Sequence, residues 1–121
     1  MGNVFGWVEL ITHDTEGAKK FYGELFDWTL KDEEMPGGNY TMIDTGQCPG
    51  GGIMKTPEEG VPTHWGVYIE TSNIVEACAK IVTLGGQVIK EPFDIPDVGT
   101  LAVALDPQGA VFQLWQGLAK K

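Results

Sequence analysis

Hydrophobic positions in the first half of the chain follow two different periods. From Val4 to Thr12 a strand is predicted, in which the side chains of Trp7, Glu9 and Ile11 point one way and those of Val8 and Leu10 the other. After Asp14 the apolar residues recur every three or four positions up to Leu25, which predicts an amphipathic helix with Asp14 at its N-terminus. Turn residues then separate three further predicted strands, over 28–31, 40–45 and 52–55.

The same order of elements returns in the second half. Residues 56–63, rich in Pro, Gly and polar side chains, predict a linker. A strand over 64–71 and a helix that starts at Asn73 and ends before Gly85-Gly86 follow it, and then strands over 87–93, 100–105 and 110–116. We therefore predict one α+β domain over residues 1–121, with βαβββ modules at 4–55 and 64–117. Their two mixed half-sheets are expected to face each other across a cleft.

Composition and charge narrow the function classes. The 121 residues suffice for one domain with a hydrophobic core, since 42% are hydrophobic. The chain has eight basic residues, all of them lysines, and 17 acidic residues, which gives a formal net charge of −9. Nucleic acids and anionic membranes attract cationic surfaces, so neither is an expected partner. The chain shows no secretory signal, no membrane-spanning run and no CxxC spacing, and we expect a cytoplasmic protein with reduced thiols.

Several short segments carry a family resemblance that extends over residues 4–117. They are Trp7-Val8-Glu9-Leu10, Ala18-Lys19-Lys20-Phe21-Tyr22, Leu25-Phe26-Asp27-Trp28, Leu84-Gly85-Gly86 and Asp106-Pro107-Gln108-Gly109-Ala110-Val111-Phe112. With the tandem βαβββ order, they resemble the vicinal oxygen chelate superfamily of glyoxalases, bleomycin-resistance proteins, extradiol dioxygenases and methylmalonyl-CoA epimerase. The resemblance implies a small-molecule ligand, a lyase, isomerase or dioxygenase reaction, and a homodimer.

The resemblance also implies positions for a metal. The family's metal enzymes use His, Glu or Gln from the first and last strands of each half, and the matching positions here are Trp7, Met54, Gly66 and Gln113. Iron, zinc, nickel and manganese favour imidazole and carboxylate ligands at such sites, so these residues predict no cofactor, although the family allows a divalent metal. A shifted metal site made of Glu9, His64 and Gln113 stays open as an alternative.

Strand alternation selects the residues that face the predicted cleft. Glu9 is the candidate general base, because burial among aromatic residues would raise its pKa. A solvated Glu9, or one paired with His64 or a lysine, is the alternative. Tyr68 is the second candidate catalytic residue, as a hydrogen-bond donor to a substrate oxygen. The candidate substrate-binding residues are Trp7, Met54, His64, Gln113 and Trp115.

Three functions follow from these residues. The first is a glyoxalase-like protein that binds a small, mainly apolar or aromatic molecule, with Glu9 as base if it is an enzyme. The second is a non-catalytic protein that sequesters a compound, as bleomycin-resistance proteins do. The third is a regulatory or structural subunit whose cleft faces serve dimerisation. Lactoylglutathione lyase activity is not expected for two reasons. The chain has no arginine to bind the two carboxylates of glutathione, and its set of metal-ligand residues is incomplete.

Overall fold

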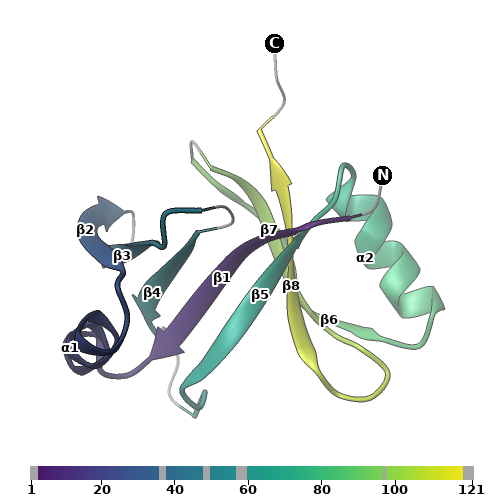
Figure 1. Cartoon of the computed structure of the whole chain (residues 1–121). Helices are drawn as coiled ribbons and strands as arrows, with labels where there is room; N and C mark the ends of the chain where they lie inside the picture. Colours follow the sequence, from purple (N-terminus) through teal and green to yellow (C-terminus); the bar gives the residue numbers. More distant parts are fainter. Residues whose placement is uncertain (1–2, 36–37, 48–49, 57–59, 97, 119–121) are drawn as a thin grey trace. The chain divides into compact units, whose positions relative to one another are not determined.

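The described residues of the computed structural model form eight strands and two helices (Figure 1). The structure describes residues 3–35, 38–47, 50–56, 60–96 and 98–118. The order of elements confirms the predicted α+β class with a repeated βαβββ arrangement. The elements are β1 (Phe5–Thr12), α1 (Thr15–Leu25), β2 (Thr29–Met35), β3 (Gly38–Asp44), β4 (Gly51–Lys55), β5 (His64–Glu70), α2 (Ile74–Thr83), β6 (Gln87–Ile95), β7 (Gly99–Leu105) and β8 (Val111–Gly117).

The chain divides into two compact units. The first unit is Trp7–Gly66, and the second unit is Met1–Gly6 together with Val67–Lys121. The division therefore falls within β1 and β5, whereas the predicted modules divide at residues 56–63, of which 57–59 lie outside the described residues. The predictions of a single domain and of half-sheets that face each other across a cleft stay predictions.

The first unit is a four-stranded mixed sheet with α1 on one face. Its strand order is β2-β3-β4-β1, in which β1 and β4 are parallel and the other pairs antiparallel. Leu10, Ile43 and Ile53 form the core beneath the helix, and Ala18 and Tyr22 of α1 pack against them. The helix begins as predicted, because the side chain of Asp14 accepts a hydrogen bond from the backbone N–H of Gly17.

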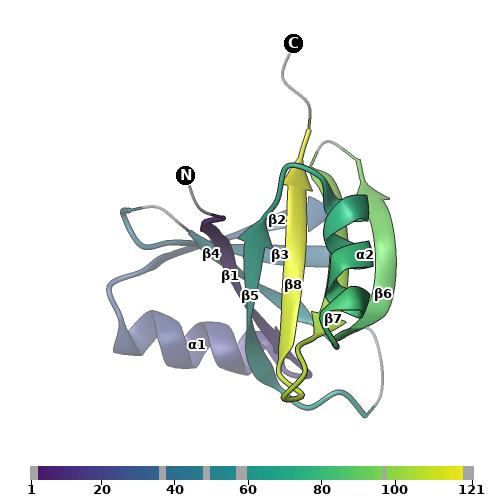
Figure 2. The same ribbon diagram turned by 90° about the vertical axis from the view of Figure 1, so that its right-hand side faces the viewer.

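The second unit repeats this arrangement with α2 against β6 and β7 (Figure 2). Its strand order is β6-β7-β8-β5, again with one parallel pair, β5 with β8. Cys78 and Leu114 belong to its core, together with the fully covered Ala102 and Ala104. The side chain of Asn73 caps α2 by accepting from Glu76 N, and Gln116 Oε1 accepts from Ile74 N.

The clearest difference from the predicted elements is the length of β2. The prediction ends this strand at residue 31, whereas it continues to Met35. The acidic run 32–34 belongs to the edge strand of the first unit, where Asp32 is opposite Thr41 on β3. Asp32 accepts hydrogen bonds from Lys19 Nζ and Thr41 Oγ1, so a charged side chain is retained in the strand.

Among the described residues, no helix has both the length and the apolar character that a membrane crossing requires.

Candidate functional site

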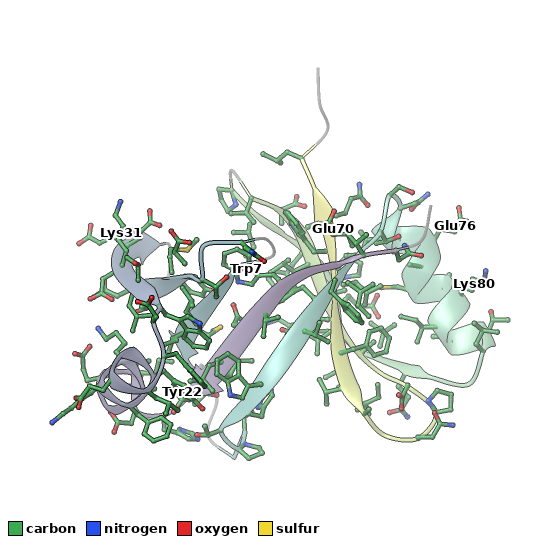
Figure 3. All side chains as sticks on the ribbon, in the orientation of Figure 1. Trp7, Tyr22, Lys31, Glu70, Glu76 and Lys80 are labelled. Atoms are coloured by element: carbon green, nitrogen blue, oxygen red, sulfur yellow. The ribbon has the colours of Figure 1, made fainter. Side chains whose placement is uncertain are left out.

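Three side chains on the face of the first sheet away from α1 form a hydrogen-bonded chain. Trp7 Nε1 donates to Tyr40 Oη at 2.8 Å, and Tyr40 Oη donates to Glu9 Oε2 at 2.7 Å (Trp7 is labelled in Figure 3). Trp7 and Glu9 stand two residues apart on β1, so they share one face of the strand. Glu9 is 5% exposed, so this carboxylate is held inside the unit by a neutral donor.

A glycine on the intervening strand makes this chain sterically feasible. Gly52 of β4 is paired with Glu9 on β1 and with Met42 on β3. A methyl group at Gly52 would overlap the hydroxyl and ring of Tyr40. The Tyr40 side chain therefore reaches across β4, from β3 to β1, over a position that has no side chain.

The electrostatics keep Tyr40 in its donor form. Burial raises the pKa of the Tyr40 phenol far above its ordinary value, and the negative charge of Glu9 raises it further. An ionised phenolate would lie against a carboxylate with little water to screen the repulsion. Tyr40 therefore remains protonated at physiological pH and can act as the hydrogen-bond donor to Glu9 Oε2.

A shallow depression of about 480 Å³ adjoins this chain at Trp7. Its volume falls within the range of small-molecule sites. Lys31 and Met42, which are opposite each other on β2 and β3, contribute a cation and an apolar thioether. The lining residues are Trp7, Thr29, Lys31, Met42, Ile43, Asp44, Gly46, Gln47 and Gly50. The depression therefore combines an aromatic wall with polar groups of both charges.

The other predicted site residues of the first unit, Met54 and His64, have different surroundings. Met54 is half-buried on β4, opposite Ile11 of β1. His64 begins β5, and its Nδ1 lies 2.7 Å from the backbone oxygen of Pro62. Neither lines the depression at Trp7. Their assignment to a ligand site stays a prediction.

The second unit brings together the remaining predicted residues on one strand pair. Tyr68 on β5 is opposite Gln113 on β8, and both are buried. Glu70 and Trp115 are the next pair on the same face, because side chains alternate along a strand. Trp115 Nε1 is buried and has no hydrogen-bond partner among the described residues. Alternation thus predicted which side chains share this face, and their roles stay predictions.

Sequence reasoning did not identify Tyr40 or the role of Gly52. A signal for both is present in the sequence. Alternation over β3 places Tyr40 and Met42 on one face, and a glycine within β4 is a position over which a large side chain can pass. The strand registers, which alternation does not give, are what bring Tyr40 to Glu9.

The residues at the inherited metal positions do not fit a divalent metal. Trp7 is a hydrogen-bond donor to Tyr40, Met54 offers only a thioether, and Gly66 has no side chain. Within the described ranges, no group of three or more His, Cys, Asp or Glu side chains could hold a metal ion. The shifted metal site of Glu9, His64 and Gln113 stays a prediction. Glu9 and His64 belong to the first unit, and Gln113 belongs to the second.

Comparison with known proteins establishes the family. The model of the Glyoxalase/Bleomycin resistance protein/Dioxygenase superfamily matches residues 4–114. The chain belongs to this superfamily. This confirms the resemblance found in the sequence, and members of the superfamily include enzymes that use divalent metals and proteins that bind small molecules.

Two kinds of curated relatives match this superfamily chain. CFP32 of Mycobacterium tuberculosis, which carries the provisional name of a glyoxylase, is 42% identical over 109 residues, which are 89% of this chain and 42% of the relative. The anthracycline biosynthesis protein DnrV of Streptomyces peucetius is 30% identical over 125 residues, 91% of this chain and 46% of the relative. The chain thus spans less than half the length of these relatives.

Solved structures confirm the superfamily fold. Protein BH1468 of Bacillus halodurans C-125 superimposes with a TM-score of 0.75 at 15% identity, covering 100% of this chain and 99% of that one. Methylmalonyl-CoA epimerase of Mycobacterium tuberculosis superimposes with a TM-score of 0.69 at 13% identity, covering 95% and 88%. At these identities the likeness concerns the fold alone.

Proposed function

We propose that this superfamily member binds a small, mainly aromatic molecule against Trp7, and that Glu9 acts as a general base in a lyase- or isomerase-type reaction. The observation that supports the proposal best is the chain from Trp7 through Tyr40 to Glu9, beside a depression of small-molecule size. An indole ring offers a flat face for stacking, and Met42 offers an adaptable apolar contact.

The proposed reaction is abstraction of a proton from carbon. Glu9 lies about 7 Å along β1 from Trp7, so a ligand of two or three fused rings that stacks on the indole spans this distance. The carbon–hydrogen bond of the ligand breaks, the proton moves to the Glu9 carboxylate, and the electron pair moves into an adjacent carbonyl. Tyr40 is a positioning residue in this scheme, because it fixes Oε2 of Glu9 and the indole of Trp7 at once.

The chemistry of one group of relatives supports an aromatic ligand. The DnrV and DauV relatives are named for anthracycline biosynthesis, and anthracyclines are fused-ring aromatic ketones. A carbonyl group joined to an aromatic system acidifies neighbouring C–H bonds. Such a compound therefore supplies both the flat surface for Trp7 and the acidic proton for Glu9.

A non-catalytic binding protein is the second candidate. The hydrogen bond from Tyr40 to Glu9 Oε2 favours this candidate. Glu9 is only 5% exposed, and through Tyr40 it holds the Trp7 side chain in place, a role that serves ligand binding without any proton transfer. The two candidates share the ligand and differ in whether Glu9 accepts a proton.

The test uses anthrone, a fused three-ring ketone with an acidic CH₂ group. Binding is measured by calorimetry, and proton abstraction by the exchange of the CH₂ protons with D₂O, followed by NMR. We expect Trp7→Ala to weaken binding at least about tenfold, whereas Trp65→Ala, a change at an exposed tryptophan that does not line the depression, leaves it unchanged.

Catalysis by Glu9 predicts that the protein accelerates this exchange and that Glu9→Gln removes the acceleration while binding persists. Binding without acceleration identifies a binding protein. No detectable binding at about 1 mM anthrone, or equal affinities of the wild type and Trp7→Ala, would contradict the proposed ligand class.

A further inference from the structure

Among the described residues that line the depression at Trp7, Lys31 is the only one with a positive charge (both are labelled in Figure 3). Lys31 is exposed on β2. The residue before it, Leu30, packs against the core beneath α1, so alternation turns Lys31 to the other face of the sheet. The chain has no arginine and a formal net charge of −9. Lys31 is therefore a local exception to a field that repels anionic ligands.

The strand registers place Lys31 at one end of a row of residues that ends at Glu9. Lys31 on β2 is opposite Met42 on β3, and Met42 is opposite Gly52 on β4. Gly52 is in turn paired with Glu9 on β1. Residues directly opposite each other share a face of the sheet, so this row crosses the face that carries Trp7. Its two ends have opposite charges, and a ligand with one anionic group is oriented along the row with that group toward β2.

The contacts of the first unit do not use the charge of Lys31. On the helix side of the sheet, Lys19 Nζ forms an ion pair with Asp32 at 3.1 Å, whereas no ion pair between described residues includes Lys31. Asp44 is the acidic residue that lines the depression, and its Oδ1 accepts a hydrogen bond from the backbone N–H of Gly46 at 2.8 Å. The ammonium group of Lys31 is therefore able to donate to a ligand.

The span from Trp7 to Lys31 suits a fused-ring ligand with an acidic group at its edge. Strands β4 and β3 separate β1 from β2, so the backbones of β1 and β2 lie about 14 Å apart. The indole of Trp7 covers part of this span, because a methyl group at Gly50, the residue before β4, would lie 3.5 Å from its ring. Two or three fused rings that stack on the indole extend over β3. The flexible side chain of Lys31 then reaches a carboxylate at their edge.

We propose that the ligand of this depression is a fused-ring aromatic carboxylate and that Lys31 binds its carboxylate group. This inference rests on the proposed function, to which it adds the charge and the orientation of the ligand. The anionic group of the ligand lies toward β2, and the opposite edge of the ring system lies toward Glu9 on β1. Met42, between the two charged ends of the row, offers its thioether to the rings.

The test compares two probes by calorimetry, naphthalene-2-carboxylate and the uncharged naphthalene-2-carboxamide, which has nearly the same shape. At low ionic strength we expect the wild type to bind the carboxylate at least about threefold more tightly than the carboxamide. Lys31→Met should lower the affinity for the carboxylate to that for the carboxamide or below it, because the net charge of the chain then repels the anion. The affinity for the carboxamide should change less than about twofold. Lys31→Arg should retain the preference, since a guanidinium also binds carboxylates.

Lys20→Met is the matched control, because Lys20 is exposed on α1, on the other side of the sheet, and its loss changes the net charge equally. This variant should keep the preference for the carboxylate, and Trp7→Ala should weaken the binding of both probes. Probes that depend on Trp7 but bind with equal affinities overturn the inference and leave the proposed function standing. A preference that survives Lys31→Met, or that Lys20→Met removes, does the same. If neither probe binds at about 1 mM, or Trp7→Ala alters neither affinity, the proposed site fails and the inference fails with it.

Discussion

Removing the hydroxyl of Tyr40 tests the hydrogen-bonded chain at the candidate site. Tyr40→Phe leaves the ring over Gly52 and deletes both the bond to Glu9 Oε2 and the bond from Trp7 Nε1. A hydrogen bond to a charged group contributes about 1.5–3 kcal/mol and a neutral one about 0.5–1.5 kcal/mol. Tyr40 is only half-buried, and water replaces part of the loss. We expect the free energy of unfolding at pH 7 to fall by about 2 kcal/mol.

The raised pKa of Tyr40 adds a pH dependence with a definite sign. In the unfolded chain the phenol ionises near its ordinary pKa of 10.0, whereas in the folded chain burial and Glu9 keep it protonated to higher pH. The contribution of Tyr40 to the free energy of unfolding is therefore complete below about pH 10. Above that pH it declines by about 1.4 kcal/mol per pH unit. The difference in stability between the wild type and Tyr40→Phe should accordingly shrink between pH 9 and pH 11.

The assay is urea unfolding followed by circular dichroism at several pH values, with Tyr22→Phe as the matched control. The Tyr22 hydroxyl accepts a longer bond, 3.2 Å from Trp65 Nε1, and its loss should cost only about 0.5–1.5 kcal/mol. A loss below about 0.5 kcal/mol for Tyr40→Phe at pH 7 would refute the hydrogen-bond reasoning. A difference from the wild type that stays constant up to pH 11 would refute the account of the pKa.

Two further predictions concern steric and chemical features of the two units. Gly52→Ala should expel the Tyr40 side chain and lower the free energy of unfolding, measured in urea, by at least about 2 kcal/mol. Gly46→Ala is the control, because a methyl group there meets open space, and it should cost about 1 kcal/mol for the positive φ of Gly46 alone. Burial and the charge of Glu91 raise the pKa of the Cys78 thiol, so its alkylation by iodoacetamide at pH 8, followed by mass spectrometry, should be at least about tenfold slower in the folded protein than in urea. Equal rates in the two states would show that the thiol is accessible.

The fold was largely predictable because its elements depend on neighbouring residues. The alternation from Val4 to Thr12 and the helical period after Asp14 locate β1 and α1 to within one residue. The second half repeats them with the same order of strands. The acidic run in β2 was missed as a strand, because its charged residues have low strand preference and its pairing with β3 stabilises it nonetheless.

The candidate site was predictable only in part. Alternation assigned Glu9 to the face of Trp7, and the structure places both on the face away from α1. The sequence left the partner of Glu9 open between solvent, His64 and a lysine, and the structure adds Tyr40 as a hydrogen-bond donor to its carboxylate. The role of Gly52, which leaves room for the phenol ring of Tyr40, depends on the tertiary structure.

The amino-acid sequence alone determined which segments are strands and helices, that they repeat, and which family they resemble. These properties follow from periods of two and three to four residues, which are local. The tertiary structure alone decided that Tyr40, thirty-one positions after Glu9, reaches it across Gly52. That contact depends on the registers of β3 with β4 and of β4 with β1, and a shift of one residue in either would turn the side chain to the other face.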